Sequence, residues 1–249
     1  MLTWIVDTFT ALSIVPRFIL LVWVLEMISV PILKWRWGMR AERTGIILGV
    51  LLQATAVIAA LYIAWGVWPT LRAALIIAGL GWVMEYVGSH TGWPFGRYHY
   101  TERLQPQLGG VPLLIPLAWL MMLPPAWAVG RLITGGTSAS FILIAALAFT
   151  AWDLFLDPQM IAWGFWMWDQ PGSYFGVPWL NYVGWLLISA VMTALAAPDL
   201  LPTAPLFLIY GITWFFQALG QFFFWKLRGP AVTGALGMGI WVVWAWLML

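Results

Sequence analysis

The sequence predicts an all-α protein, a polytopic integral membrane bundle of seven or eight transmembrane helices. Of its 249 residues, 63% are hydrophobic and only 8% are charged, whereas soluble domains carry about 25% charged residues. The mean hydropathy is +0.91, and apolar windows of about 20 residues, each long enough for one span, recur along the chain. Neither half contains a segment of soluble composition, so we expect a single integral membrane domain over residues 1–249.

The composition also excludes several kinds of protein. There is no cysteine, which excludes a disulfide framework, thiolate chemistry and a cysteine metal site. The formal net charge of +2 comes from Lys and Arg in the loops. It reflects membrane topology and gives no reason to expect nucleic acid as a partner. The N-terminus lacks a basic region and carries Asp7, so we expect no cleaved signal peptide.

The first four spans are expected at Pro16–Leu33, Thr44–Trp65, Pro69–Ser89 and Val111–Leu132. The first contains Glu26, and the third ends close to Glu85. A polar loop from His90 to Gly110 separates the third span from the fourth and holds both histidines of the chain. The fourth span is expected to be interrupted by its prolines, Pro116, Pro124 and Pro125.

The last four spans are expected at Ser138–Asp157, Trp179–Ala196, Thr203–Trp225 and Val232–Leu249. Proline has no backbone N–H and its ring clashes with the preceding helical turn, so Pro158 is expected to end the fifth helix. We interpret the aromatic piece Pro158–Asp169 as a separate interfacial or re-entrant helix. A turn rich in glycine and proline follows it.

The distribution of basic residues orients the bundle. Cytoplasmic loops of membrane proteins carry an excess of Lys and Arg. An eight-span arrangement with both termini outside places eight of the eleven basic residues in the cytoplasm, namely Lys34, Arg36, Arg40, Arg43, Arg97, Arg103, Lys226 and Arg228. The protein is then expected in the cell membrane, with its intramembrane polar groups in the cytoplasmic half and one site opening toward that leaflet.

Three acids are the candidate catalytic residues. Asp153 and Asp157 are four residues apart and share one face of their helix, and Glu85 lies at a similar predicted depth. A carboxylate in the bilayer costs several kcal/mol, so an acid kept there indicates a functional site. Clustered carboxyl groups in a medium of low dielectric cannot all ionise, which would leave some of them as proton donors. The alternative is a structural pair at a helix end, with Asp157 solvated.

A wider set of side chains is expected to support the site. His90 and His99 are either solvated loop residues or part of a proton supply, and their spacing does not indicate a metal site. The cluster around Trp163 and Trp166 either belongs to an interfacial belt or holds a rigid polyene and stabilises a cation. The other supporting candidates are Glu26, Arg97, Tyr98, Asp169, Tyr174, Asn181, Gln217 and Gln221.

Two long stretches resemble a known family. They are WDLFLDPQMIAWGFWMWDQPGSYFGVPWLNYVGWLL from Trp152 and EYVGSHTGWPFGRYHYTERLQPQLGGVPLLIPLAWLMM from Glu85. Both resemble the carotenoid biosynthesis membrane family, which includes CruF-type carotenoid 1',2'-hydratases and bisanhydrobacterioruberin hydratases. The resemblance implies addition of water to the C1'=C2' bond of an acyclic ψ end group, as in γ-carotene or lycopene. It implies a C40 or C50 carotenoid, water and membrane lipid as partners, with other enzymes of the carotenoid pathway as further candidates.

This chemistry needs an acid, a base and no cofactor. A carboxylic acid protonates C2', the cation forms on tertiary C1', and a carboxylate takes a proton from the water that adds there. We expect Asp153 or Asp157 as the acid and Glu85 as the base, with the reverse assignment still open. Two rival functions remain. A Mg²⁺-dependent membrane prenyltransferase would use Asp-x-x-x-Asp for a diphosphate, and a carotenoid-binding or transport protein would need the aromatic residues but no buried acids.

Overall fold

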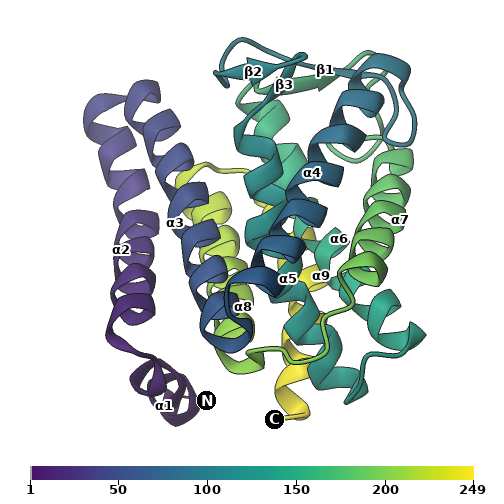
Figure 1. The fold of residues 1–249 in the computed structure, drawn as a ribbon. Helices are drawn as coiled ribbons and strands as arrows, with labels where there is room; N and C mark the ends of the chain where they lie inside the picture. Colours follow the sequence, from purple (N-terminus) through teal and green to yellow (C-terminus); the bar gives the residue numbers. More distant parts are fainter. Residues whose placement is uncertain (1) are drawn as a thin grey trace.

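The computed structural model describes residues 2–249 and confirms an all-α membrane bundle (Figure 1). A short helix α1 (Leu2–Ala11) precedes eight helices that are long and apolar enough to cross a membrane. In chain order, these eight are α2 (Ile14–Trp37), α3 (Met39–Trp65), α4 (Val67–Thr91), α5 (Leu114–Thr134), α6 (Ala139–Ala162), α7 (Trp179–Ala196), α8 (Thr203–Leu219) with a π-helical continuation η1 (Gly220–Phe224), and α9 (Arg228–Leu247).

The connections between the first spans are shorter than expected. Gly38 alone separates α2 from α3, and Gly66 alone separates α3 from α4. Their φ angles are +69° and +76°, a conformation that glycine adopts without a steric penalty. A single residue in this conformation reverses the chain, so the helices extend to the turn. This is why α2 continues to Trp37, beyond the predicted end at Leu33.

Prolines lie inside the helices without ending them, which corrects two predictions. Helix α6 runs through Pro158 to Ala162, and α5 runs through Pro124 and Pro125. A proline at position i leaves the carbonyl of residue i−4 without its helical donor. The Tyr174 hydroxyl donates to the carbonyl of Leu154 at 3.0 Å, and the Gln53 side chain donates to the carbonyl of Met121 at 3.3 Å. Side chains from elsewhere in the chain therefore replace the missing backbone donors.

Two small antiparallel sheets cover one end of the bundle (Figure 1). Strand β1 (Tyr98–Tyr100) pairs with β4 (Trp166–Trp168), so that Tyr98 faces Trp168 and Tyr100 faces Trp166. The second sheet pairs β2 (Gln107–Leu108) with β3 (Val111–Pro112). The expected helix at Pro158–Asp169 is thus wrong. Its first residues extend α6, and its last ones form a strand because they find a partner in the loop after α4.

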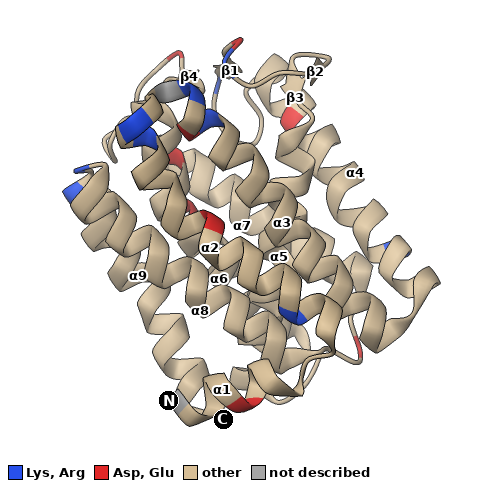
Figure 2. Cartoon of the chain, turned by 90° about the vertical axis from the view of Figure 1, so that its left-hand side faces the viewer, with Lys and Arg blue, Asp and Glu red and all other residues tan. Residues whose placement is uncertain are grey.

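Most of the basic residues gather at one end of the bundle (Figure 2). The α2–α3 turn, the α4–α5 loop and the η1–α9 turn carry the eight basic residues named above, and all three lie at the end that the sheets cover. Both termini lie at the opposite end (Figure 1). The segregation on which the predicted orientation depends is therefore present in the fold, and the assignment of the sheet-covered end to the cytoplasm stays a prediction.

Candidate active site

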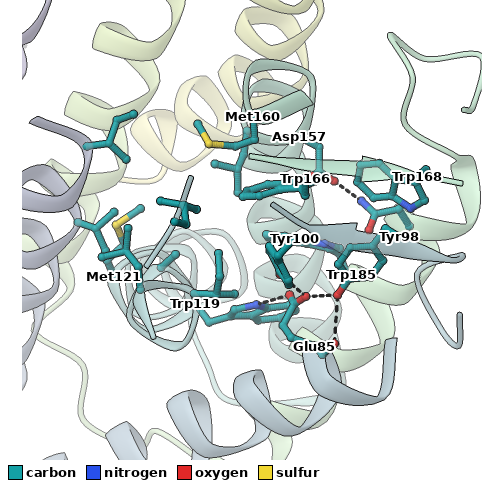
Figure 3. Close-up of a pocket in the computed structure, with 18 residues that line it drawn as sticks. Glu85, Tyr98, Tyr100, Trp119, Met121, Asp157, Met160, Trp166, Trp168 and Trp185 are labelled. Carbon is teal, nitrogen blue, oxygen red and sulfur yellow. Dashed lines mark hydrogen bonds between the residues drawn. The ribbon is translucent and has the colours of Figure 1, made fainter. Parts of the chain in front are cut away.

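A cavity of about 70 Å³ lies beneath the β1–β4 sheet and is lined by residues of α3, α4, α5, α6 and α7 (Figure 3). Two of the three predicted catalytic acids, Glu85 and Asp157, line it. The alternation of a strand explains how the sheet contributes, because neighbouring side chains point to opposite faces. Tyr98 and Tyr100 point into the cavity while His99 is exposed, and Trp166 and Trp168 point into it while Met167 is exposed.

Glu85 accepts hydrogen bonds on both of its carboxyl oxygens (Figure 3). One oxygen accepts from Trp119 Nε1 at 3.0 Å. The other accepts from the Tyr100 hydroxyl at 2.7 Å and from the Tyr98 hydroxyl. Only 5% of the Glu85 surface is exposed, so protein donors take the place of water. Three hydrogen-bond donors around one carboxyl group favour its negatively charged form, which accepts through both oxygens.

Asp153 and Asp157 form a second acidic group, held by Asn181 of α7. The Asn181 side-chain nitrogen donates to Asp153 Oδ2 at 2.8 Å and also to Asp157 Oδ2. Asp157 Oδ1 accepts from Trp166 Nε1 at 3.0 Å, whereas Asp153 Oδ1 has no partner within the described chain. The exposed fractions are 0% and 2%. Asp157 faces the cavity, and Asp153 lies behind it, one helical turn away.

The carboxyl groups occupy an aromatic enclosure. Trp119 stacks on Trp185 with ring centroids 4.7 Å apart, and Phe149 contacts both rings, at 5.1 Å from Trp185 and 5.0 Å from Trp119. The Tyr100 ring meets Trp166 edge to face at 5.6 Å. Aromatic faces turned toward a small dry space can stabilise a cation there. The enclosure therefore offers acid, base and cation-stabilising groups together.

The hydroxyls of Tyr98 and Tyr100 remain protonated donors. Burial raises the pKa of both tyrosines well above the usual value of 10.0, and the negative charge of Glu85 raises each further. A tyrosine whose pKa is raised keeps its proton to higher pH. The hydrogen bonds to Glu85 therefore persist throughout the physiological range.

Three aromatic residues of the cavity wall were not among the predicted site residues, namely Tyr100, Trp119 and Trp185. Trp119 and Trp185 lie inside their helices, where an interfacial belt gives no reason for tryptophan. Their position within the predicted spans could have identified these two tryptophans as candidate site residues. The sequence also indicates the two strands, because the triplets Tyr98–Tyr100 and Trp166–Trp168 alternate large aromatic and other residues with the period of a strand.

Several predicted supporting residues lie outside this cavity. His90, Arg97, His99 and Asp169 are all exposed at the sheet-covered end. The His90 ring stacks on Tyr86 at 4.2 Å and does not reach Glu85 through any hydrogen bond of the described chain. His99 Nδ1 is 3.4 Å from Asp169 Oδ1, above the sheet. These groups lie at the surface of the cap and form no hydrogen bond of the described chain with the enclosed acids.

The other supporting residues divide between two places. Glu26, Trp163 and Gln217 line a second cavity that adjoins the first. Gln221 is buried beside that cavity and donates to Gln159 Oε1 at 2.8 Å. Tyr174 and Asn181 instead act on α6, the former by its hydrogen bond to Leu154 and the latter through the aspartates. The predicted single cluster of intramembrane acids therefore contains Glu85, Asp153 and Asp157, with Glu26 apart from them.

No group of three or more His, Asp or Glu side chains in residues 2–249 has the arrangement of ligands for one metal ion. The donors to Glu85 and Asp157 are N–H and O–H groups of the protein.

The fold and the cavity define a polytopic α-helical membrane protein that encloses carboxyl groups among aromatic side chains inside its bundle. A model of the carotenoid biosynthesis protein family matches residues 45–240. The chain belongs to this family. It is also similar to a bisanhydrobacterioruberin hydratase of Haloarcula japonica, with 37% identity over 139 residues, which are 52% of this chain and 47% of that protein. The chain thus spans about half the length of the curated relative it matches, and no solved structure matches it.

Proposed function

We propose that this protein is a carotenoid hydratase that adds water across the C1'=C2' bond of an acyclic ψ end group, giving a tertiary 1'-hydroxyl. The observation that carries the proposal is the pairing of Glu85 with Asp157 across one enclosed aromatic cavity. Membership of the family and the similarity to a protein named as a hydratase support it. The substrate class is a lycopene- or γ-carotene-type polyene, and the reaction is that of a hydro-lyase.

The first step is protonation of C2'. Asp157 is the acid that faces the cavity, and Asp153 lies directly behind it, close enough for the two carboxyl groups to interact. Two buried carboxyl groups so close together cannot both be charged, so the pair holds a proton. Asp157 gives this proton to C2' as the alkene π electrons form the new C–H bond. Positive charge then develops on C1', where two methyl groups and the chain stabilise it.

The second step is capture of the cation by water. Glu85, held by its three donors, is the carboxylate that binds the water and accepts a proton when the C1'–O bond forms. The aromatic faces of Trp119, Trp166 and Trp185 surround the cation meanwhile. The sum of the two steps is one added H₂O. The proton on Glu85 returns to Asp157 through water in the cavity, which restores both groups and requires no cofactor.

The rival functions make different demands on the same residues. A Mg²⁺-dependent prenyltransferase needs carboxylates that bind the metal and cationic side chains that bind the phosphates, but no Lys or Arg is among the described residues that line this cavity. A carotenoid carrier gains nothing from burying three acids at a cost of several kcal/mol each. Neither rival function explains why three hydrogen-bond donors surround Glu85.

The test is expression in a lycopene-accumulating host, with mass analysis of the pigments. A product heavier by one water, with a tertiary hydroxyl, is the expected result, and membranes treated exhaustively with a chelator should still form it. A product heavier by an isoprenoid unit, lost on chelation and restored by Mg²⁺, would identify the prenyltransferase. Binding of the pigment without any change of mass would identify the carrier.

A further inference from the structure

A second cavity, of about 240 Å³, lies between α2, α3, α6, α8 and η1. It borders the first cavity, because the same side chains line both spaces: Ile46, Val50, Met121, Leu156 and Met160. Methionine is unbranched and adapts its shape easily. Met121 and Met160 lie at the boundary between the two cavities, and a ligand can displace their flexible side chains.

The first cavity is too small for a whole carotenoid. A space of about 70 Å³ can take only the reacting end of a C40 polyene. The remainder of a C40 polyene, which is about as long as the bilayer core is thick, must leave through one wall. The wall that leads into another cavity is the one bordered by Met121 and Met160.

The walls of the second cavity suit a long apolar chain. Most of its lining is apolar, with aromatic side chains from three directions: Trp23, Trp152, Trp163, Phe216, Phe224 and Trp225. Two of its polar groups are engaged within the protein, since Gln53 donates to Thr213 at 3.2 Å and Gln159 accepts from Gln221 at 2.8 Å. Glu26 also lines the cavity, and its Oε1 has no hydrogen-bond partner within the described chain. A conjugated polyene has no hydrogen-bonding groups and gains only dispersion contacts and burial here.

The second cavity also reaches the lipid-facing surface. Ile28 of α2 and Phe224 of η1 both line it, yet they are 46% and 61% exposed. Helix α2 lies along α3 at the edge of the bundle (Figure 1). Near the sheet-covered end, Glu42 ties this pair to η1, because it accepts from Trp225 Nε1 at 2.6 Å and from Lys34 at 2.7 Å. The α2–α3 pair is thus held to Trp225 near the sheet-covered end, whereas the cavity opens toward lipid beside α2.

We infer that the second cavity binds the polyene stem of the substrate, and that the substrate enters it from the bilayer between α2 and the α8–η1 segment. The ψ end group then passes Met121 and Met160 to reach Glu85 and Asp157. This inference rests on the proposed function, because it takes the substrate to be a carotenoid. It adds a stem-binding site and a lateral route of access that the hydration chemistry alone does not require.

The absence of cysteine from the chain allows a direct test of occupancy. In a Met27→Cys variant, the sole thiol lies in the wall of the second cavity, and it is labelled with a membrane-permeant maleimide with and without lycopene. At a lycopene concentration about ten times Kd, mass action should slow labelling roughly tenfold. A Leu21→Cys variant, with its thiol on the exposed face of the same helix, should be labelled at an unchanged rate.

A second variant tests passage between the cavities. Ile46→Trp places an indole at the shared boundary and should lower hydrated product by at least about tenfold, whereas Ile63→Trp, on an exposed part of α3, should not. Hydration that proceeds normally in Ile46→Trp, without protection of Met27→Cys, would overturn the stem site and leave the hydratase standing. Protection of Met27→Cys without any hydrated product would keep the stem site and reject the proposed reaction.

Discussion

The hydroxyl of Tyr174 donates a hydrogen bond to the carbonyl of Leu154 at 3.0 Å, and this is the carbonyl that Pro158 leaves without a helical partner. Tyr174 lies in the loop after β4, so a side chain 20 residues further along the chain completes the helix. The same contact fixes the last turns of α6, from which both aspartates project. A loop tyrosine thereby holds the acidic group in place.

The first prediction concerns this contact. Tyr174→Phe keeps the ring but leaves the carbonyl of Leu154 unpaired, and a buried acceptor without a partner costs about 1–3 kcal/mol. The thermal midpoint of the detergent-solubilised protein should fall, and hydrated product should fall with it. Tyr62→Phe, at an exposed site on α3, is the matched control and should leave the midpoint unchanged. Equal midpoints for both variants would show that water or Thr233 satisfies the carbonyl instead.

The sequence predicted the spans well because hydropathy depends on composition within one segment. The turn at Gly38 needed no long-range information either, and only its length was missed. The β1–β4 pair is different, since Tyr98 and Trp168 are 70 residues apart and each strand has three residues. Alternation over three residues is too short a signal to predict a pairing. The tryptophans of Pro158–Asp169 were therefore assigned to a helix that the structure does not contain.

The candidate site shows the same difference between features that follow from local sequence and features that depend on long-range packing. Asp153, Asp157 and Glu85 could be predicted because an acid at bilayer depth is costly wherever it lies. Their partners could not be predicted in the same way. Tyr100 approaches Glu85 because the cap folds onto α4, and Trp119 does so because α5 packs against α4. The energetic cost of an acid inside the bilayer does not predict which acids share a site. Glu26 is also an intramembrane acid, yet it lines the second cavity.

A second prediction concerns the packing that holds the cap. The Phe95 ring lies between Gly88 of α4 and Gly184 of α7, where an added Cβ would lie 2.6 Å from ring atoms in either case. The Phe95 carbonyl accepts from Trp168 Nε1 at 3.0 Å, so displacing the ring disturbs β4. Gly88→Ala and Gly184→Ala should each destabilise the protein by about 1–3 kcal/mol.

The control for these variants lies on the same helix as Gly88. An added Cβ at Gly79 meets no atom within 4 Å, so Gly79→Ala should be neutral or stabilise α4 by up to about 1 kcal/mol. Thermal unfolding in detergent compares all three variants. If Gly88→Ala and Gly79→Ala unfold at the same temperature, the Phe95 contact does not constrain the cap.

A third prediction concerns the donors to Glu85. Tyr100→Phe removes one hydrogen bond from the carboxylate while keeping the ring against Trp166, and loss of a donor to a charged group in a dry site costs about 10²-fold in rate. Because burial raises the pKa of Tyr98 and Tyr100 above 10.0, neither loses its proton as the pH rises from 7 toward 10. The wild-type rate should therefore show no fall from tyrosine ionisation in that range.

The measurement is initial hydration rate against pH for wild type and for Tyr100→Phe. Neither profile should show a fall between pH 7 and 10 from tyrosine ionisation, and the variant should be slower than wild type. A fall of the wild-type rate between pH 7 and 10 that Tyr100→Phe abolishes would show that Tyr100 ionises in this range, contrary to the burial argument.

A fourth prediction concerns orientation. The eight basic residues at the sheet-covered end should face the cytoplasm, because positively charged loops are retained there. Reporter fusions at Arg40, Arg103 and Lys226 should all report a cytoplasmic position, and fusions at the two ends of residues 1–249 should report the opposite side. A periplasmic signal at Arg103 would invert the sheet cap and place Glu85 and Asp157 toward the outer leaflet.

The last prediction concerns the acids. Asp157→Asn and Glu85→Gln keep the size of the side chain but replace the carboxyl group with an amide that neither gives nor takes a proton, so each should lower hydration by about 10²–10⁴-fold. Asp153→Asn should also lower it, because Asp153 shares Asn181 with Asp157, although it does not line the cavity. Folding should be little affected, since a neutral amide is cheaper than a carboxylate inside the bilayer.

Asp199→Asn is the matched control, because Asp199 lies exposed in the loop between α7 and α8 and should tolerate the change. The measurement is the yield of hydroxylated carotenoid, normalised to the amount of protein in the membrane. A smaller loss in Asp153→Asn than in Asp157→Asn would fit the position of Asp157 at the cavity wall. Wild-type yield from both aspartate variants would make the pair structural, and the proton donor would then have to be Glu85 itself, supplied through Tyr98 and Tyr100.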